Sequence, residues 1–363
     1  MTTSQGPLKV LYFAVRYDFY PRNRRIRAYL ENEYSAEITI VPALIGGNPL
    51  VRYVRQLLLA VRAGRGHDLV VLAEFNLHYF AFSWLAAKLN RAPHLVDFFV
   101  GKYESAVQDR ATYRADSLRA RLLRLVDRFA ILSSSSCVTD TEPRARNFAA
   151  LAGGSRAFRV LPVGAPAWAY PRGARDAGPS EPVRLLYYGN YIPLHGLDAL
   201  LDALPAVQHD VRLTMIGNGS RREGIEKRVR ELGWSDRVSF RDHISETDLA
   251  EVISDHDVVI GIFGSSSKAA TVIANKVWQG LYMGRVVLTR SSAALADIAG
   301  ICGDALIQAE DVTPSGLAAA VDRAAAASQE HGRPETDIAG DLERYVSDRF
   351  DEAFLAIVGP KPS

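Results

Sequence analysis

Short runs of consecutive apolar residues recur along the first half of the chain, separated by segments in which apolar residues follow helical spacing. Such runs, about four to eight residues long, are typical of strands buried on both faces of a parallel sheet. They occur at 8–15, 68–74, 93–100, 137–141 and 158–164, and the helical segments include 23–33, 50–64 and 117–133. The alternation predicts a doubly wound α/β domain.

The pattern lapses at residues 166–182, where proline, glycine and small polar residues prevail, as in a linker. It then restarts, with apolar runs at 183–190, 212–219, 237–244, 257–264, 286–288 and 305–310. Helical spacing lies between these runs, at 197–207, 223–233, 246–256 and from residue 271 onward. We therefore predict a second α/β domain of the same kind, so that two Rossmann-like doubly wound domains face each other across a cleft.

The domain limits follow from this pattern. We predict an N-terminal domain at 1–170, a linker at 171–182, a C-terminal domain at 183–340 and a C-terminal helix at 341–363. Apolar residues at helical spacing in 341–358 require a packing partner. The alanine-rich stretch 324–337 is predicted to be an exposed loop or a frayed helix end.

Composition is that of a globular protein, with 48% hydrophobic and 23% charged residues among 363. No apolar run approaches the roughly 18–20 residues of a membrane span. The N-terminus lacks the basic and apolar regions of a signal peptide, so we expect a cytoplasmic protein. Cys137 and Cys302 lie in apolar contexts without metal-ligand spacing, which indicates neither a disulfide nor a zinc site.

Charge is unevenly distributed although the net charge is only +2. Residues 1–170 hold 23 Lys and Arg against 13 Asp and Glu, whereas the remaining residues hold 20 against 28. A basic half suits a phosphate-bearing substrate, an anionic membrane or nucleic acid, and charge alone does not choose among them. Nucleic acid is disfavoured because the basic residues are scattered and form no recognisable binding module.

One basic segment also has an apolar stripe. In 117–131, leucines occur at helical spacing and are flanked by four arginines, Arg119, Arg121, Arg124 and Arg128. Such a helix can lie on an anionic membrane, which would make the protein peripheral to the inner face of the membrane. A helix with a solvated basic face is the alternative.

The turns that follow strands are the places where doubly wound domains bind ligands. After the run 183–190, Gly189 lets a ligand approach the backbone, and Asn190 and His195 can hydrogen-bond phosphate or sugar hydroxyls. A glycine-rich loop with His195 as a solvated helix cap is the alternative interpretation.

A second turn, "GNGS" at 217–220, follows another strand and precedes a helix, so Gly217 and Asn218 are candidates for contacts with an anion or a ribose. The GxGxxG spacing of a dinucleotide site is absent, and no acidic residue ends the next strand in the position that would hold a ribose. Nicotinamide and flavin chemistry are thereby disfavoured, and we expect no cofactor.

A third segment, "GIFGSSSKAATVIANK" at 261–276, combines glycine, serine and two lysines ahead of a helix. Lys268 and Lys276 can neutralise the charge that develops on a leaving diphosphate. The segment is not a Walker A loop, because GxxxxGK[ST] is missing. A flexible loop with solvated lysines is the alternative.

In the first domain, Arg22 and Asn23 follow the first strand and are the side chains of "YDFYPRNRRIR" that we expect to point toward the ligand. Asp97 ends the run 93–100 and can orient a hydroxyl or act as a base, with a structural capping aspartate as the alternative. His78 is a further candidate, and a satisfied core histidine is the alternative there.

On these residues the chain resembles the GT-B glycosyltransferases of family 4 over nearly its whole length. The resemblance is strongest in "LLYYGNYIPLHGLDALLDAL", "LTMIGNGSRREGIEKRVRELGWSDRVSFRDHI" and "GIFGSSSKAATVIANKVWQGLYMGRVVLT". It implies that the first domain binds the acceptor and the second the nucleotide-sugar, with a final helix that crosses back to the first domain. Donor contacts implied in the second domain are Gly189, Asn190, His195, Gly217, Asn218, His243, Lys276 and Gln279.

The resemblance is partial at single positions. Asn190 and His195 stand where family members often have the Arg and Lys that bind diphosphate. Thr271 and Gln279 stand where many have two glutamates eight residues apart, the second of which binds ribose. A glutamine can hydrogen-bond a ribose diol but carries no negative charge.

The activity implied is a retaining transfer of a sugar from a nucleoside-diphosphate donor, without a metal ion, to a sugar, lipid-linked or small-molecule acceptor. Asp97, Lys268 and Lys276 are the candidate catalytic residues, and Arg22, Asn23 and His78 the acceptor-side residues. The alternatives are epimerisation at C2 of a nucleotide sugar on the same fold and a non-catalytic subunit that binds nucleotide-sugars. The sequence does not decide the nucleotide, the sugar or the acceptor.

Overall fold

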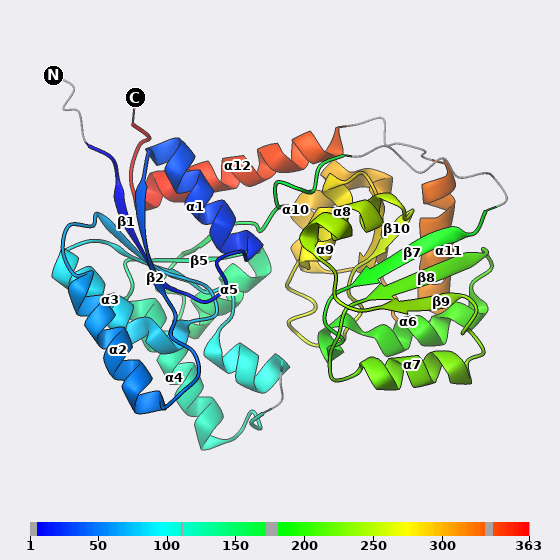
Figure 1. Cartoon of the computed structure of the whole chain (residues 1–363), viewed down its shortest axis with the longest axis horizontal. Coiled ribbons are helices and arrows are strands. Elements are labelled where there is room, and N and C mark those ends of the chain that lie inside the picture. Colours follow the sequence, from blue (N-terminus) through cyan, green and yellow to red (C-terminus); the bar gives the residue numbers. More distant parts are fainter. Residues whose placement is uncertain (1–5, 110–111, 172–180, 331–336, 363) are drawn as a thin grey trace. The chain divides into compact units, whose positions relative to one another are not determined.

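The computed structural model describes residues 6–109, 112–171, 181–330 and 337–362 (Figure 1). Its contacts divide the chain into two compact units. The first unit comprises residues 1–163 and 346–363, and the second comprises residues 164–345. Most of the linker predicted at 171–182 lies outside the described residues.

The first unit contains a six-stranded sheet in the order β2-β1-β3-β4-β5-β6, parallel throughout. Its strands are β1 (Lys9–Val15), β2 (Glu37–Pro42), β3 (Leu69–Leu72), β4 (His94–Asp97), β5 (Ser136–Thr139) and β6 (Phe158–Val160). Five of these coincide with the predicted apolar runs. The fold class predicted from the alternation of strands and helices is confirmed.

Helices cover both faces of this sheet. They are α1 (Pro21–Tyr34), α2 (Pro49–Arg62), η1 (Leu77–Tyr79), α3 (Phe80–Asn90), η2 (Glu104–Asp109), α4 (Leu118–Ser133) and α5 (Glu142–Leu151). One core cluster joins alternate residues of β1, β3 and β4 to Ala60 of α2, Ala86 of α3 and Ile131 of α4. Because these small and apolar side chains share one cluster, α2, α3 and α4 pack on the same face of the sheet.

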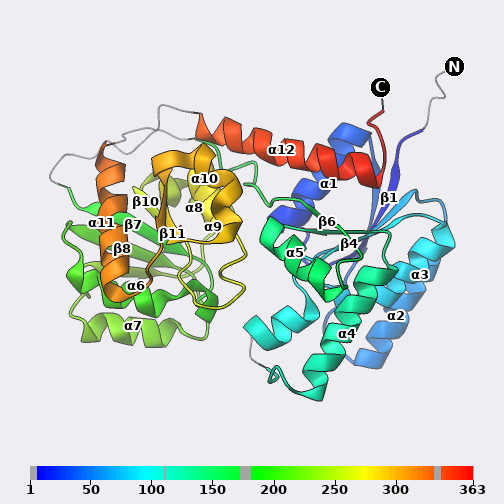
Figure 2. The same ribbon diagram turned by 180° about the vertical axis from the view of Figure 1, so that it is seen from behind.

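The second unit repeats the architecture with a parallel sheet in the order β12-β11-β10-β7-β8-β9 (Figure 2). Its strands are β7 (Val183–Tyr188), β8 (Val211–Ile216), β9 (Val238–Arg241), β10 (Val258–Ile260), β11 (Val286–Arg290) and β12 (Leu306–Ala309). Its helices are η3 (Pro193–His195), α6 (Leu197–Ala203), η4 (Leu204–Ala206), α7 (Arg222–Glu231), α8 (Glu246–Ser254), α9 (Asn275–Tyr282), η5 (Ala293–Leu295), α10 (Ala296–Cys302), η6 (Gly303–Ala305) and α11 (Pro314–Glu330). Each apolar run predicted in this half is a strand.

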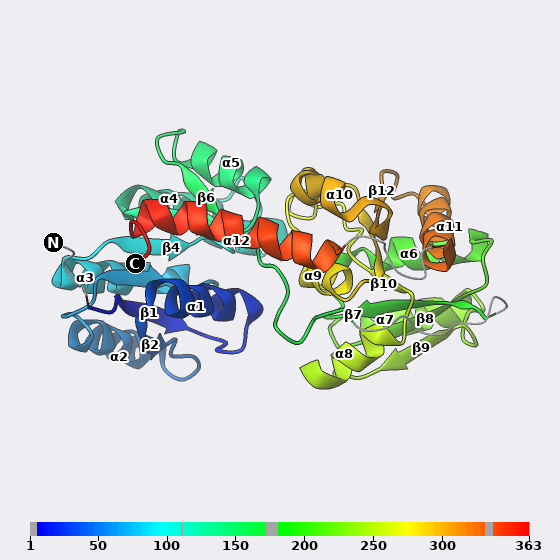
Figure 3. The ribbon, with the colours of Figure 1, turned by 90° about the horizontal axis from the view of Figure 1, so that it is seen from above.

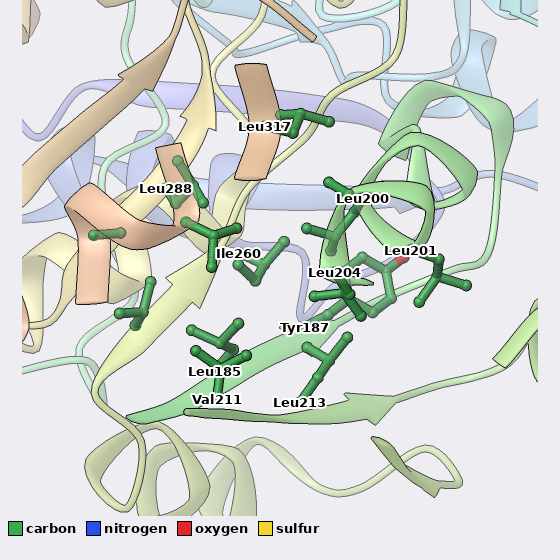
Figure 4. Packing of buried hydrophobic residues seen from close by; sticks show 14 of the residues in the cluster. Leu185, Tyr187, Leu200, Leu201, Leu204, Val211, Leu213, Ile260, Leu288 and Leu317 are labelled. Carbon is green, nitrogen blue, oxygen red and sulfur yellow. The ribbon is translucent and has the colours of Figure 1, made fainter. Parts of the chain in front are cut away.

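The core of the second unit lies between the sheet and helices α6 and α11 (Figure 4). Leu185 and Ile260 of the central strands share this cluster with Leu200 of α6 and Leu317 of α11. Burial of each such leucine or isoleucine contributes about 1.5–3 kcal/mol of transfer free energy. This packing fixes the central strands, and therefore the turns at their carboxyl ends.

The last helix, α12 (Ile338–Ile357), ends on the first unit beside α1 (Figure 3). Tyr29 of α1 stacks on Phe354, with ring centroids 5.2 Å apart, and its hydroxyl donates to Asp351 at 2.5 Å. Earlier in the helix, Glu343 accepts a hydrogen bond from Tyr282 of the second unit at 2.9 Å. The predicted return of the C-terminal helix to the first domain is confirmed.

Two local predictions need correction. Residues 324–330 belong to α11, and Ala324, Ala325 and Ala327 are buried, so the predicted exposed loop is wrong there. Small alanine side chains let this helix pack closely on the sheet, and an apolar pattern based on large residues misses them. Residues 331–336 lie outside the described residues. The helix expected from Thr271 begins at Asn275.

No helix in the described parts of the chain combines the length and the apolar character that crossing a bilayer requires.

Candidate active site

The carboxyl ends of β7, β8 and β10 in the second unit bring three glycine-containing turns together. Gly217 has φ +121°, and a Cβ there would collide with the carbonyl oxygen of Gly189. Gly264 would likewise collide with the carbonyl of Leu194, whose oxygen accepts a hydrogen bond from the Gly264 amide at 3.1 Å. Glycine is therefore required for these turns to touch, and their contact fixes the edge of the site.

Lys276 lies in the first turn of α9, at this edge, and is only 5% exposed. Its Nζ has no hydrogen-bond partner among the described residues and sits 4.0 Å from the centroid of the Tyr187 ring. Burial lowers the pKa of Lys276 to about 7. A buried ammonium without a carboxylate is costly unless an anionic ligand compensates it.

Gly280 explains how α9 comes so close to the sheet. A Cβ at this position would lie 2.8 Å from a methyl group of Val287 in β11 and 3.0 Å from Val259 in β10. Gly280 follows Lys276 by one helical turn, so both residues face the sheet. The close approach places the Lys276 side chain over the ends of the central strands.

His195 is held beside Lys276. Its Nδ1 lies 2.7 Å from the hydroxyl of Tyr187, which also lies 2.8 Å from the carbonyl oxygen of Asn190. Burial and the nearby Lys276 lower the pKa of His195 to about 2, so the imidazole is neutral. If the tyrosine donates to the carbonyl, Nδ1–H donates to the tyrosine and Nε2 is left as an acceptor.

Gly189 joins this group. A Cβ on Gly189 would lie 3.6 Å from Nζ of Lys276 and 3.7 Å from His195. The structure thus brings Gly189, His195 and Lys276 together at one edge of the sheet. The side chain of Asn190 is exposed beside them.

Gln279 is buried one turn along α9, and its Oε1 accepts a hydrogen bond from the hydroxyl of Tyr188 at 2.8 Å. Burial raises the pKa of Tyr188 well above its ordinary value, so this hydroxyl remains a donor. The tyrosine fixes the orientation of the amide.

Asn218 and His243 lie on exposed turns after β8 and β9. Arg222 of α7 organises this end of the sheet, because its Nη1 donates to Asn218 at 2.6 Å, to the Gly217 carbonyl at 2.9 Å and to Asp242 at 2.5 Å. His243 follows Asp242 directly, two strands away from β7 in the sheet.

Lys268 lies in the turn before α9 and is half-buried. Its carbonyl oxygen accepts a hydrogen bond from the Thr271 hydroxyl at 3.1 Å and another from the Val272 amide.

In the first unit, Arg22 and Asp97 form a buried ion pair. Nε of Arg22 donates to Oδ2 at 2.6 Å and Nη2 to Oδ1 at 2.9 Å, while Nη1 donates to the Leu161 carbonyl at 2.6 Å. Burial opposes the charge on Arg22, but Asp97 outweighs it and raises the pKa of Arg22. The polar atoms of both side chains are therefore hydrogen-bonded within the first unit. This arrangement favours a structural role for Asp97 over a catalytic one.

Asn23 is also buried, and its amide donates to Glu74 and to the Tyr17 carbonyl, each at 2.7 Å. Burial and the neighbouring Asp97 raise the pKa of Glu74 to about 7. The Asn23 side chain is therefore hydrogen-bonded inside the first unit, near the end of β3.

His78 lies at the same edge, in η1, and is partly exposed. Burial, together with the nearby cations of Lys102, Arg52 and Arg16, lowers its pKa to about 4. These cations come from the carboxyl ends of β4, β2 and β1, so four basic side chains converge here.

The described residues contain no group of three or more His, Cys, Asp and Glu side chains that could hold a metal ion.

Comparison with known proteins identifies what the chain is similar to. Residues 182–326, the part that holds Lys276, match the family model described as "Glycosyl transferases group 1". This stretch therefore resembles a glycosyltransferase domain. A search of curated proteins gave no significant match.

Solved structures resemble the whole chain at low identity. HepE from Anabaena, in complex with UDP, is 13% identical with a TM-score of 0.66, covering 96% of this chain and 97% of its own. The lipopolysaccharide outer core galactosyltransferase WaaB is 13% identical with a TM-score of 0.65, covering 96% and 99%. WaaG, a glycosyltransferase involved in lipopolysaccharide biosynthesis, is 15% identical with a TM-score of 0.57, covering 97% and 100%. They show that this chain has the GT-B fold.

Sequence reasoning missed several polar residues of the glycosyltransferase domain. Tyr187 and Tyr188 end β7 and hold His195 and Gln279, and Arg222 holds Asn218. The pair of tyrosines ahead of Gly189 was a signal, because a buried tyrosine hydroxyl needs a partner. Their partners lie on other elements, so spacing alone did not reveal them.

Proposed function

We propose that the protein is a retaining glycosyltransferase that moves a sugar from a nucleoside-diphosphate donor to an acceptor without a metal ion. The observation that carries the proposal is the unpaired ammonium of Lys276 at the carboxyl edge of the glycosyltransferase domain. A positive charge placed there stabilises the diphosphate as the sugar leaves. Lys276 supplies the charge that a metal ion otherwise provides.

Neighbouring groups fit the rest of a nucleotide-sugar. His195 is neutral and can accept from, or donate to, sugar hydroxyls and phosphate oxygens. Gln279 presents an amide, held by Tyr188, that can hydrogen-bond a ribose diol. HepE was solved with UDP and with UDP-glucose, so UDP-sugars are the donors we would test first. Lys268, Asn218 and His243 remain candidates for the outer parts of the donor.

For the acceptor, the first unit offers the edge that carries His78. Arg16, Arg52 and Lys102 gather around it, and no salt bridge joins Arg16 or Arg52 to a carboxylate among the described residues. Nε of Arg52 is buried and also lacks a hydrogen-bond partner within the described ranges. Unpaired cations favour an acceptor with a phosphate or carboxylate group, as in surface polysaccharide or glycolipid assembly. Arg22 and Asn23 would shape this edge rather than bind directly.

We also place the protein in the cytoplasm, with peripheral contact at the inner face of the membrane through residues 117–131. Such a location suits an acceptor that is linked to a lipid.

Nucleotide binding is the direct test. Melting curves with UDP, GDP, dTDP and ADP should show a rise with one of them, because a ligand that binds only the folded state adds about 2.7 kcal/mol at a hundredfold excess over Kd. The control is the same series with the corresponding nucleoside, which lacks the diphosphate. If no nucleotide shifts the melting temperature, the donor site is misplaced.

Turnover separates the remaining alternatives. An epimerase would convert UDP-N-acetylglucosamine without any acceptor, whereas a transferase needs one or hydrolyses its donor slowly. A non-catalytic subunit would bind the nucleotide and leave every donor intact. Release of UDP only in the presence of an acceptor supports transfer.

Nucleotide affinity should depend on pH. Lys276 has a pKa of about 7 in the free protein, and a bound diphosphate favours its charged form. Binding above pH 7 must therefore take up a proton, and affinity should fall by up to about tenfold for each further pH unit.

Calorimetry at pH 8 in two buffers with different ionisation enthalpies measures this uptake. The nucleotide phosphate also titrates, so the Lys276→Met variant is the control. It should take up fewer protons on binding than the wild type does. Equal proton uptake by both proteins would contradict a role for the Lys276 ammonium.

A further inference from the structure

Helix α4 presents its large apolar residues to the outside. Leu118, Leu122, Leu125, Phe129 and Leu132 are spaced four and three residues apart, and all are between 39% and 80% exposed. The opposite face buries Ala120, Asp127, Ala130 and Ile131. A helix of a globular protein normally directs its large apolar stripe to the core. Here the arrangement is inverted.

Helix α2 shows the same inversion. Its exposed apolar residues are Leu50, Val51, Val54, Leu57, Leu58 and Val61, between 36% and 73% exposed. Most fall on one stripe of the helix, while Gln56 and Ala60 are buried on the other side. Gln56 is used internally, since its side chain accepts from the Leu44 amide and donates to the Pro42 carbonyl. This buried polar contact fixes which side of α2 faces the sheet, and the apolar stripe therefore faces outward.

Both stripes belong to one surface of the first unit. Ala60 of α2 and Ile131 of α4 lie in the same core cluster, so the two helices cover the same sheet face and their stripes point away from it. Helix α3 lies between them, with Tyr53 of α2 contacting Phe82 and Phe129 of α4 contacting Phe80 (Figure 3). We call the outer side of α2, α3 and α4 the three-helix face.

Exposed charge on these three helices has one sign. Residues 43–67, 77–96 and 117–133 contain ten lysines and arginines, namely Arg52, Arg55, Arg62, Arg65, Lys88, Arg91, Arg119, Arg121, Arg124 and Arg128. The single acidic residue in these ranges is Asp127, which is 1% exposed and accepts hydrogen bonds from the amides of Lys102 and Tyr103. No carboxylate in these ranges is therefore exposed to balance the cations.

We propose that the three-helix face docks flat on an anionic lipid bilayer, with the stripes of α2 and α4 inserted at the level of the headgroups. Interfacial helices combine an apolar stripe with flanking arginines that reach lipid phosphates. Lys88 over Trp84 shows the pairing of cation and aromatic ring that suits this boundary. A second copy of the chain is a less suitable partner, because its arginines would face the arginines of the first copy. Nucleic acid is also less suitable, because it offers no apolar surface to cover the two stripes.

This docking surface adds α2 to the membrane contact proposed for 117–131. It rests on the proposed membrane contact and does not depend on the transfer reaction. Failure of vesicle binding would leave nucleotide binding untouched, and failure of nucleotide binding would leave the surface unchanged. The two proposals are therefore tested separately.

The experiment is flotation of the full chain with vesicles of phosphatidylcholine alone or with about one-third phosphatidylglycerol. The wild type should float with the anionic vesicles and remain in solution with the neutral ones. The double variant Leu58→Gln/Leu125→Gln, with one change on each stripe, should lose at least about tenfold in vesicle affinity. Both side chains are exposed, so the melting temperature should not fall.

Leu355→Gln is the matched control, because Leu355 is an exposed leucine of α12 in the same unit, away from the three-helix face. It should bind vesicles like the wild type. Two results would overturn the proposal. In one, the double variant binds anionic vesicles as well as the wild type does. In the other, the wild type ignores vesicles but sediments as a dimer that the double variant dissociates.

Discussion

Replacing Lys276 with methionine is expected to slow glycosyl transfer by about a thousandfold, which is the loss seen when a charge-stabilising donor is removed from an active site. It should also raise the melting temperature of the nucleotide-free protein. The ammonium is buried without a hydrogen-bond partner among the described residues, and methionine fills nearly the same volume without that penalty. The free energy of unfolding at pH 7 should rise on the order of 2 kcal/mol.

The sign of this gain can be checked with pH. The folded-state pKa of Lys276, about 7, lies below its ordinary value of 10.5, so the unfolded chain binds the extra proton between these values. Stability of the wild type therefore rises with pH across that window, and the advantage of Lys276→Met should shrink as pH rises toward 10. Melting curves at several pH values measure it.

Lys227→Met is the control, because Lys227 is an exposed lysine on α7 of the same unit. It should change neither transfer nor melting temperature. A Lys276→Met protein that keeps the nucleotide affinity and turnover of the wild type would show that the donor diphosphate binds elsewhere.

The strands could be predicted because most are largely buried and therefore apolar on both faces. Strand β2, which the pattern missed, is an edge strand in which Val41 is the one buried residue. Its alternating sequence lacks the continuous run that marks the inner strands. Helix α11 was missed for a different reason, since alanine is common in both helices and loops and carries little apolar signal.

The site could be predicted only in part. Gly189, His195 and Lys276 follow or flank strand ends, and strand ends of one parallel sheet share an edge. Which ends are neighbours depends on strand order, and β7 lies between β10 and β8. The sequence does not state this order, so the contact of Lys276 with Tyr187 could not be anticipated. The same limit applies to Arg22 and Asp97, which are 75 residues apart in sequence.

Replacing Asp97 with alanine is expected to lower the free energy of unfolding by about 3–5 kcal/mol, because it leaves the guanidinium of Arg22 charged and buried without its carboxylate. Denaturant titration measures the loss. Asp116→Ala removes the carboxylate of the exposed pair with Arg114 and should leave the unfolding midpoint unchanged.

The double variant Arg22→Met/Asp97→Leu distinguishes the two roles considered for Asp97. Replacing both partners with apolar side chains leaves no unpaired charge, so stability should return to within about 1 kcal/mol of the wild type. If Asp97 is structural, as its bidentate contact with Arg22 favours, transfer should return with stability. A double variant that folds stably, binds nucleotide and yet transfers no sugar would instead show that Asp97 acts on the substrate, which is the catalytic role predicted from its place at the end of β4.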